Sequence, residues 1–339
     1  MKPFIRTLLL FFAAPALLVT IVVALYFRKD VYMDFGPYPN YSWKYYFQQL
    51  DDLSTKKYLQ SEKNYNSFIL GSSRSVGVYG CYLQTKIPNS RFFHYGSWSE
   101  SIGAIHQKLW FLDSTGVDIR NAVLYIDTDN TFHKDGASFS QHFVFTGGNE
   151  TMYRLKHMKT FLLAKEPEYM KILLGMDVHG EIFPNWESDV TTNDCQHKCS
   201  SEVISAYGFR NQSHQDSVKI DSLIKVDFLY SRKTAQQYSA DQISGIEEIK
   251  LAAISKILKK HHTNFYVVIT PLYDQIRFSS RDMNILNQYF GNRVFDFSGI
   301  NSFTNNPYNF PDRKHFLPVI SKTMLDSVLT LTNPSGIQP

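Results

Sequence analysis

Short apolar segments that end in turn-forming or polar residues recur along most of the chain, and segments with apolar residues at helical spacing lie between them. Short, continuously apolar segments are typical of strands that a parallel sheet buries on both faces. Apolar cores of this kind, with polar residues mostly at their ends, predict strands at residues 67–70, 90–95, 121–126, 264–270 and 293–297. The periodic segments predict helices at 75–85, 102–112, 240–260, 282–290 and 319–331.

Strands that alternate with helices predict an α/β fold, because each helix returns the chain so that the next strand can run parallel to the last. We expect one parallel sheet of about five strands with helices on both faces, a three-layer arrangement of the flavodoxin type. Residues from about 132 to 234 break the alternation, and a loop region this long is uncommon in a compact domain unless it is functional. We therefore expect an insertion after the third strand that forms a lid or a partner surface, with short helices at 153–164 and 168–174.

The amino-terminal segment 8–27 is apolar and contains no charged residue. A helix of about 20 such residues spans the hydrocarbon core of a bilayer, whereas the apolar part of a signal peptide usually has about 7–15 residues. Small residues at 13–16 would suit cleavage, but the apolar run continues past them. We predict an uncleaved anchor with the rest of the chain on one side of the membrane, outside the cytoplasm. The predicted parts are an anchor at 1–29, a tether with a short helix at 30–64, the α/β domain at 65–331 and a tail at 332–339.

Net charge and cysteine content narrow the functional classes further. The net charge is only +4 at pH 7 and there is no long basic block, which argues against a nucleic-acid partner. Cys195 and Cys199 are close in sequence and predict a small-loop disulfide in an oxidising compartment. His197 lies between them, but a structural zinc site normally needs four ligands and no second pair is nearby. Cys81 is then expected to be a buried free thiol.

A cluster of hydroxyl residues follows the first predicted strand. Gly71 provides the turn, and Ser72, Ser73 and Ser75 then stand at the carboxyl end of the strand, at the start of a helix. Open α/β sheets bind ligands at this edge, and a helix amino terminus offers N–H groups to a developing oxyanion. Taken alone, the cluster is also typical of an ordinary turn with a helix N-cap.

Asp312 precedes His315 by three residues near the other end of the chain. This spacing can place both side chains on one side of a turn, where Asp312 would orient His315 and His315 would deprotonate a serine. In the alternative interpretation, Asp312 is a helix N-cap and His315 is an ordinary residue of the first turn.

Together, Gly71-Ser72-Ser73 and Asp312-x-x-His315 resemble the SGNH (GDSL-like) hydrolase superfamily, which carries its nucleophile in Gly-Asp-Ser after the first strand and Asp-x-x-His close to the carboxyl terminus. The resemblance covers residues 65–330 in short blocks only. It implies that Ser73 is the nucleophile, that His315 is the base and that Asp312 orients it. It implies no metal and no organic cofactor. This sequence departs from the family pattern at Ser72, where the family has Asp.

The same resemblance implies three oxyanion donors. Two are the N–H groups of Ser73 and of Gly96, which follows the second strand. The third is an Asn side chain of a Gly-x-Asn-Asp block after the third strand, where this chain has Asp-Thr-Asp-Asn at 127–130. Without a gap, Asp129 takes the Asn position and its carboxylate would repel an oxyanion, whereas a shift of one residue brings Asn130 there. We predict Asn130; alternatively, these polar residues only end the strand and Gly96 only forms a turn.

The first functional hypothesis is a membrane-anchored, extracytoplasmic serine acyltransferase or esterase that acts on an ester-linked acyl group of a cell-surface glycan or glycolipid. A single anchor before such a domain resembles the membrane-anchored bacterial branch of the family, similar to proteins of teichoic acid D-alanylation and polysaccharide O-acetylation. That resemblance implies the bacterial inner (cytoplasmic) membrane and a polytopic membrane acyltransferase as partner. With the insertion as a lid, we expect transfer to dominate over hydrolysis. The second hypothesis is a non-catalytic binding or assembly subunit of such a complex, which Ser72 and the altered third block favour.

Overall fold

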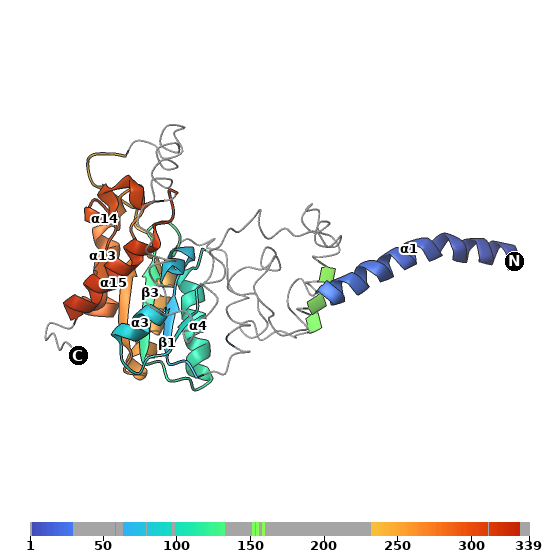
Figure 1. Ribbon diagram of the computed structural model, residues 1–339, viewed down its shortest axis with the longest axis horizontal. Coiled ribbons are helices and arrows are strands. Elements are labelled where there is room, and N and C mark those ends of the chain that lie inside the picture. The colour runs from blue at the N-terminus through green and yellow to red at the C-terminus, as the bar shows by residue number, and fades with distance from the viewer. Residues whose placement is uncertain are drawn as a thin grey trace. The chain divides into compact units, whose positions relative to one another are not determined.

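The computed structural model describes residues 2–29, 58, 64–78, 80–96, 99–132, 151–152, 154–155, 158–159, 232–310 and 312–332. The chain divides into two units, one that contains the amino-terminal helix α1 and one that contains the sheet (Figure 1). The expected short helices of the tether and of 168–174, most of the insertion and nearly all of the tail lie outside the described residues.

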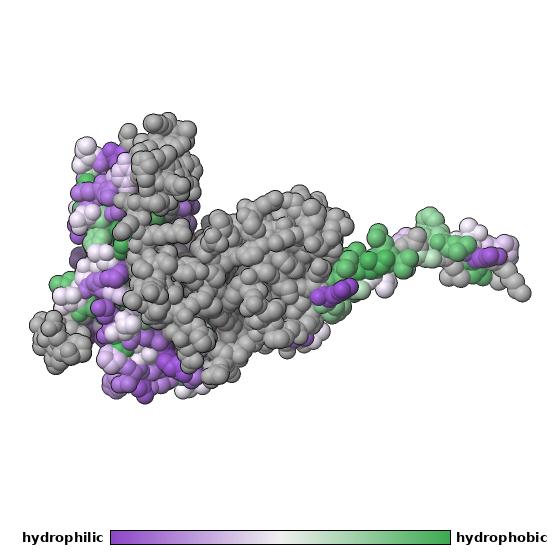
Figure 2. Space-filling model, viewed as in Figure 1, coloured by the Kyte–Doolittle hydropathy of each residue, from purple (hydrophilic) through white to green (hydrophobic). Residues whose placement is uncertain are grey.

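Helix α1, Lys2–Lys29, is long and apolar enough to cross a membrane. Large apolar side chains such as Phe11, Leu17 and Leu18 are exposed along it, and Figure 2 shows the hydrophobic surface that they form. Length and composition fit both a membrane anchor and a signal sequence near the amino terminus.

One parallel sheet organises the second unit and confirms the predicted α/β fold. The strand order is β2-β1-β3-β5-β7, and all neighbouring pairs are parallel. The strands are β1 Ser67–Leu70, β2 Phe92–His94, β3 Asn121–Ile126, β5 Asn264–Ile269 and β7 Val294–Asp296. Every residue of β1 and β3 is buried, as expected of central strands with both faces covered.

Helices cover both faces of this sheet (Figure 1). On one face, side chains of α3 and α15 such as Leu83 and Met324 join a core with Ile69 and Val123 of the strands. On the other face, Tyr58 lies between Phe68 of β1 and Phe111 of α4. Helix α12 packs against α4. The helices are α3 Gly80–Lys86, α4 Ile102–Ser114, α12 Gly245–Lys260, α13 Ser280–Phe290, α14 Ser302–Asn305 and α15 Pro318–Thr332, with 3-10 turns η2 Ser73–Gly77, η3 Gly291–Arg293 and η4 Pro307–Asn309.

The strand order places a topological switch point between β1 and β3, because the chain moves from β1 to β2 on one side and later returns to β3 on the other. Parallel sheets form their ligand sites outside the carboxyl ends of the strands at such a point. The residues that follow β1 and β3 therefore share the favoured position in this fold.

Two local features differ from the sequence prediction. The helix expected over 75–85 is divided into η2 and α3, because Ser75 Oγ donates a hydrogen bond to the Ser72 carbonyl and Val78 then adopts an extended conformation. A small parallel sheet of β4 (Gln237–Tyr238) and β6 (Ile276–Arg277) was not predicted. Strands this short contain too few residues for a period to be recognised.

Cys81 is disulfide-bonded, so the prediction of a free thiol is wrong. The chain has three cysteines in all, and Cys195 and Cys199 lie outside the described residues. A bond between Cys195 and Cys199 would use both remaining cysteines, so the structure is not compatible with that predicted pair. Closeness in sequence suggested it, but disulfide formation requires the right spacing of Cβ atoms in the fold.

We expect peptide mapping under non-reducing conditions to find the Cys81 peptide joined to a peptide that carries Cys195 or Cys199. Either bond closes a loop of more than about 100 residues, for which chain entropy gives about 5 kcal/mol of stabilisation. A Cys81→Ser variant should therefore melt at a clearly lower temperature than the oxidised protein. Recovery of Cys81 as an alkylated thiol from the untreated protein would contradict the bond.

Candidate active site

The turn after β1 is fixed by a glycine and by a serine cap. Gly71 has a φ of +149°, and a Cβ there would lie 2.5 Å from Cβ of Tyr125, so neither the conformation nor the space admits a side chain. Ser72 is the N-cap of η2, and its hydroxyl accepts a hydrogen bond from the Arg74 N–H. Ser73 is then the first residue of η2, at the carboxyl edge of the sheet, as predicted.

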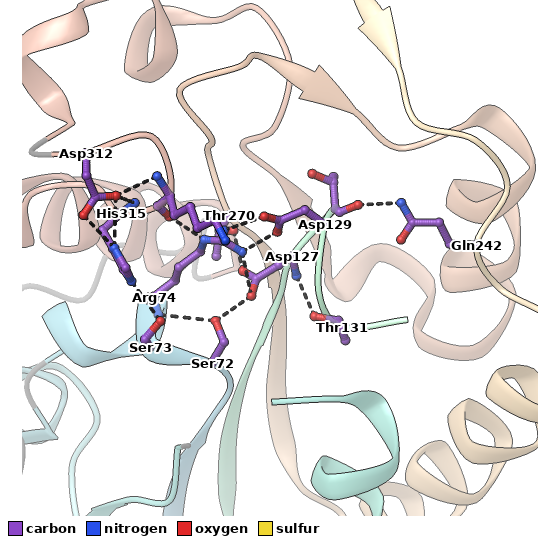
Figure 3. Close-up of polar contacts among 12 residues, drawn as sticks. Ser72, Ser73, Arg74, Asp127, Asp129, Thr131, Gln242, Thr270, Asp312 and His315 are labelled. Atoms are coloured by element: carbon purple, nitrogen blue, oxygen red, sulfur yellow. Dashed lines mark hydrogen bonds and ion pairs between the residues drawn. The ribbon is translucent and has the colours of Figure 1, made fainter. Parts of the chain in front are cut away.

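The structure brings Ser73, His315 and Asp312 into one hydrogen-bonded row (Figure 3). Oγ of Ser73 lies 2.9 Å from Nε2 of His315. Nδ1 of His315 lies 2.9 Å from Oδ2 and 3.1 Å from Oδ1 of Asp312. The hydroxyl, the imidazole and the carboxylate thus have the order that a serine nucleophile, its base and an orienting group require.

Asp312 does not cap a helix, because α15 begins only at Pro318. Its Oδ1 instead accepts hydrogen bonds from the N–H groups of Lys314 (2.7 Å) and His315 (2.8 Å). The carboxylate therefore closes a local bend and contacts the imidazole of the same bend at once. The backbone conformation of residues 312–315 therefore fixes the orientation of the imidazole ring.

The surroundings of Asp312 favour its ionised form. Burial acts to raise its pKa, but the hydrogen bond with His315, the charge of His315 and the N–H groups of the bend outweigh burial and hold the pKa below its ordinary value. Because the pKa is depressed, the carboxylate stays charged well below neutral pH, and it becomes protonated only in stronger acid. At neutral pH it can stabilise an imidazolium on His315.

We expect Asp312→Asn to lower the rate at which Ser73 reacts with a fluorophosphonate by about 10⁴-fold, because an amide can hold the imidazole in the wrong tautomer and cannot stabilise its charged form. The rate constant of labelling at pH 7 measures this effect. A variant that labels as fast as the unmodified protein would show that Asp312 does not orient the base.

Two backbone N–H groups in the loops after β1 and β2, those of Ser73 and Gly96, donate to no acceptor within the described part of the chain. Gly96 lies directly against the turn, since a Cβ on it would be 2.8 Å from the Gly71 carbonyl oxygen and 2.8 Å from Oγ of Ser75. The glycine that the resemblance singled out is thus adjacent to the serine turn, and substitution there would displace that turn.

The third predicted oxyanion donor, Asn130, forms no hydrogen bond with this row. Asn130 is partly exposed and forms no hydrogen bond within the described residues. Asp129 is held by Arg74 in a bidentate pair, with Nη1 to Oδ1 at 2.5 Å and Nη2 to Oδ2 at 2.8 Å. The guanidinium therefore compensates the carboxylate charge that would otherwise oppose an oxyanion.

A buried polar network under the serine turn was missed by the sequence analysis. Asp127 is fully buried at the end of β3 and accepts hydrogen bonds from Ser72 Oγ and Thr270 Oγ1, the latter at 2.7 Å. Nη1 of Arg74 lies 3.0 Å from Oδ2 of Asp127. Burial acts to lower the pKa of Arg74, but Asp127 and Asp129 outweigh it and raise that pKa, so Arg74 is charged at any accessible pH. The only sequence signal was a charged or hydroxyl residue directly after two strands, Asp127 after β3 and Thr270 after β5.

A second buried network also supports this turn. Glu100 and Lys108 are buried and form an ion pair at 2.5 Å. Glu100 Oε2 accepts a hydrogen bond from the Gly71 N–H (2.9 Å), and Lys108 Nζ donates to the Tyr95 carbonyl (3.0 Å). Because Gly71 and Tyr95 directly precede Ser72 and Gly96, this pair joins the two loops that carry the two predicted backbone oxyanion donors.

Comparisons with known proteins add no further assignment. The chain matches no protein-family model, and no curated protein matches it. Among the residues that the structure describes, no group of three or more His, Cys, Asp or Glu side chains could hold a metal ion.

Proposed function

We propose that the protein is a serine acyltransferase or esterase of the SGNH type, with Ser73 as nucleophile, His315 as base and Asp312 as orienting group. The hydrogen-bonded row from Ser73 to His315 to Asp312 carries this proposal. Its place at the switch point of a parallel sheet, beside the N–H groups of Ser73 and Gly96, supports it.

In the proposed reaction, Oγ of Ser73 attacks the carbonyl carbon of an ester while Nε2 of His315 takes the hydroxyl proton. The N–H groups of Ser73 and Gly96 stabilise the oxyanion of the tetrahedral intermediate. The ester C–O bond then breaks, and His315 returns the proton to the leaving alcohol. Water or an acceptor hydroxyl, deprotonated by His315, then attacks the carbonyl carbon of the acyl-serine. The bond between that carbon and Oγ of Ser73 breaks, and His315 returns the proton to Oγ. The partial exposure of His315, 36% of its side chain, leaves room for a substrate to reach the base.

The proposed location is a bacterial cytoplasmic membrane, with α1 as an anchor and the sheet domain outside the cytoplasm. The apolar helix supports this location, and so does the disulfide-bonded Cys81, because disulfides persist in oxidising compartments. A cell-surface glycan or glycolipid is the proposed acceptor, and a polytopic membrane acyltransferase is the proposed donor of acyl groups. The insertion is proposed as the lid that favours transfer over hydrolysis.

We expect the mature protein to stay with the membrane fraction and to be released by detergent but not by high salt. The 28-residue helix α1 would be held in the bilayer by its apolar side chains, and salt weakens only electrostatic attachment. Amino-terminal sequencing of the mature protein distinguishes an anchor from a signal sequence. A mature chain that begins after α1 and is soluble would contradict the anchor.

Labelling of the purified protein with a fluorophosphonate tests the proposed function. Such a probe reacts only with an activated serine, so a stable adduct on the Ser73 peptide, identified by mass spectrometry, is the expected result. A binding or assembly subunit without catalysis would give no adduct. The pairing of Asp129 with Arg74 favours this second candidate. In the alignment without a gap, Asp129 takes the position of the third oxyanion donor, and it offers a carboxylate instead of an amide.

A further inference from the structure

We propose that Arg74 is a positioning residue that sets the contact between His315 and Ser73 by joining the loop of His315 to the ends of β1 and β3. This inference rests on the proposed function, because it assigns Arg74 a role in that reaction. In the described part of the chain, the guanidinium of Arg74 forms no hydrogen bond or ion pair with the Ser73 hydroxyl or the imidazole of His315, so its role would be exerted through other residues.

Arg74 connects three segments that are far apart in sequence. It directly follows Ser73, its Nη atoms bind Asp129, and its Nε donates to the Lys314 carbonyl at 2.5 Å. Lys314 immediately precedes His315 in the chain. The guanidinium of Arg74, the residue after the proposed nucleophile, therefore binds the backbone of Lys314, the residue before the proposed base.

The loop of His315 has little regular structure of its own to fix it. Residues 312–317 contain no helix or strand. After His315 in the chain, the Leu317 N–H donates a hydrogen bond to the Asn309 carbonyl. Before His315, the Lys314 carbonyl accepts a hydrogen bond from Arg74. A shift of this loop would move the imidazole relative to Ser73, and a misplacement of about 1 Å can cost about 10²-fold in rate.

The geometry requires arginine and not only a positive charge. The side chain is 1% exposed, and its planar fork meets Asp129 with two bonds while Nε points to Lys314. A lysine has one ammonium on a flexible stem and cannot keep the bidentate pair and the carbonyl bond together. Arg74→Lys therefore keeps the charge beside Asp127 and Asp129 but loses the connection to the loop.

The test compares Arg74→Lys with Asp129→Asn and with Arg277→Lys as a matched control. Arg277 pairs with Asp296 through Nε at 2.8 Å, and its side chain is about half exposed. Two quantities are measured at pH 7: the rate constant of fluorophosphonate labelling, and the low-field proton resonance of His315 Nδ1–H in the free protein. Circular dichroism and melting temperature establish that each variant is folded.

We expect Arg74→Lys to label about 10²-fold more slowly and to lose or shift the Nδ1–H resonance. We expect Asp129→Asn, which frees one side of the fork, to label about tenfold more slowly, and Arg277→Lys to behave as the unmodified protein. A folded Arg74→Lys that labels at the unmodified rate and keeps the resonance overturns the inference. If Arg74→Lys does not fold, Asp129→Asn decides, since an unchanged rate and resonance there overturn the inference as well.

Failure of the proposed function gives a different result. If the unmodified protein does not label at all, the acyl-transfer proposal fails. The Nδ1–H resonance then still reports whether Arg74 holds the His315 loop: a resonance that Arg74→Lys shifts supports the positioning role, and an unchanged one refutes it.

Discussion

Replacing Ser73 by alanine is expected to abolish fluorophosphonate labelling and to lower kcat for an activated ester by up to about 10⁶-fold, the loss typical of a removed serine nucleophile. The reason is geometric. The Ser73 hydroxyl lies 2.9 Å from Nε2 of His315, whereas the neighbouring Ser72 hydroxyl donates a hydrogen bond to the buried Asp127. The adduct is measured by intact mass and by peptide mapping.

Ser72→Ala is the matched control, because it removes a hydroxyl from the adjacent residue. It deletes an N-cap, which costs about 1 kcal/mol of stability, and one hydrogen bond to Asp127. We expect slower labelling from a slightly destabilised protein, but the adduct should still form on Ser73. Labelling that survives in Ser73→Ala and disappears in Ser72→Ala would overturn the assignment of the nucleophile.

Replacing Glu100 by glutamine is expected to destabilise the protein by about 3–5 kcal/mol, because it leaves the Lys108 ammonium buried without its carboxylate. The side chains of Glu100 and Lys108 are 0% and 1% exposed, so water cannot take the place of the partner. The change also weakens the acceptor of the Gly71 N–H, and hence the support of the serine turn. Urea unfolding at pH 7 measures the free-energy difference.

Two further variants test whether the loss of stability in Glu100→Gln comes from the burial of the ion pair. Asp118→Asn removes an acid from a pair with Arg120 in which both side chains are more than half exposed, and it should cost less than about 1 kcal/mol. The double variant Glu100→Gln with Lys108→Met removes both charges and should recover much of the loss. If the double variant is no more stable than Glu100→Gln alone, removal of the second charge recovers nothing and the expected pairing of Glu100 with Lys108 is contradicted.

The strands were predictable because each depends on local sequence. Residues 122–126 are continuously apolar, and the predicted segment 121–126 matches β3 residue for residue. The contact between Ser73 and His315, which are 242 residues apart, was expected only because two short blocks resemble those of the SGNH superfamily. The blocks around Ser73 and Asp312 have recognisable spacings. The parallel order of the sheet then follows from alternation with helices. Boundaries shifted where side chains compete with the backbone, as Ser75 does between η2 and α3.

The contacts that could not be predicted depend on segments brought together only by the fold. Arg74 meets Asp129 across 55 residues and the Lys314 carbonyl across 240, and no spacing rule connects such positions. Cys81 was assigned wrongly for the same reason, since sequence proximity favoured the other two cysteines. A charged residue beside a motif can be read from sequence, but its partners cannot.

The separation of Ser73 and His315 along the chain has a consequence for biosynthesis. Their hydrogen bond spans 242 residues, and α15 follows it almost at once. At about 5–20 residues per second, a ribosome needs roughly 12–50 s to pass from the serine to the histidine. During that interval the emerging polypeptide carries the hydroxyl without the imidazole. A nascent or truncated product that ends before the loop of His315 therefore holds Ser73 without the imidazole, and the row of three side chains is completed only after that loop has been synthesised.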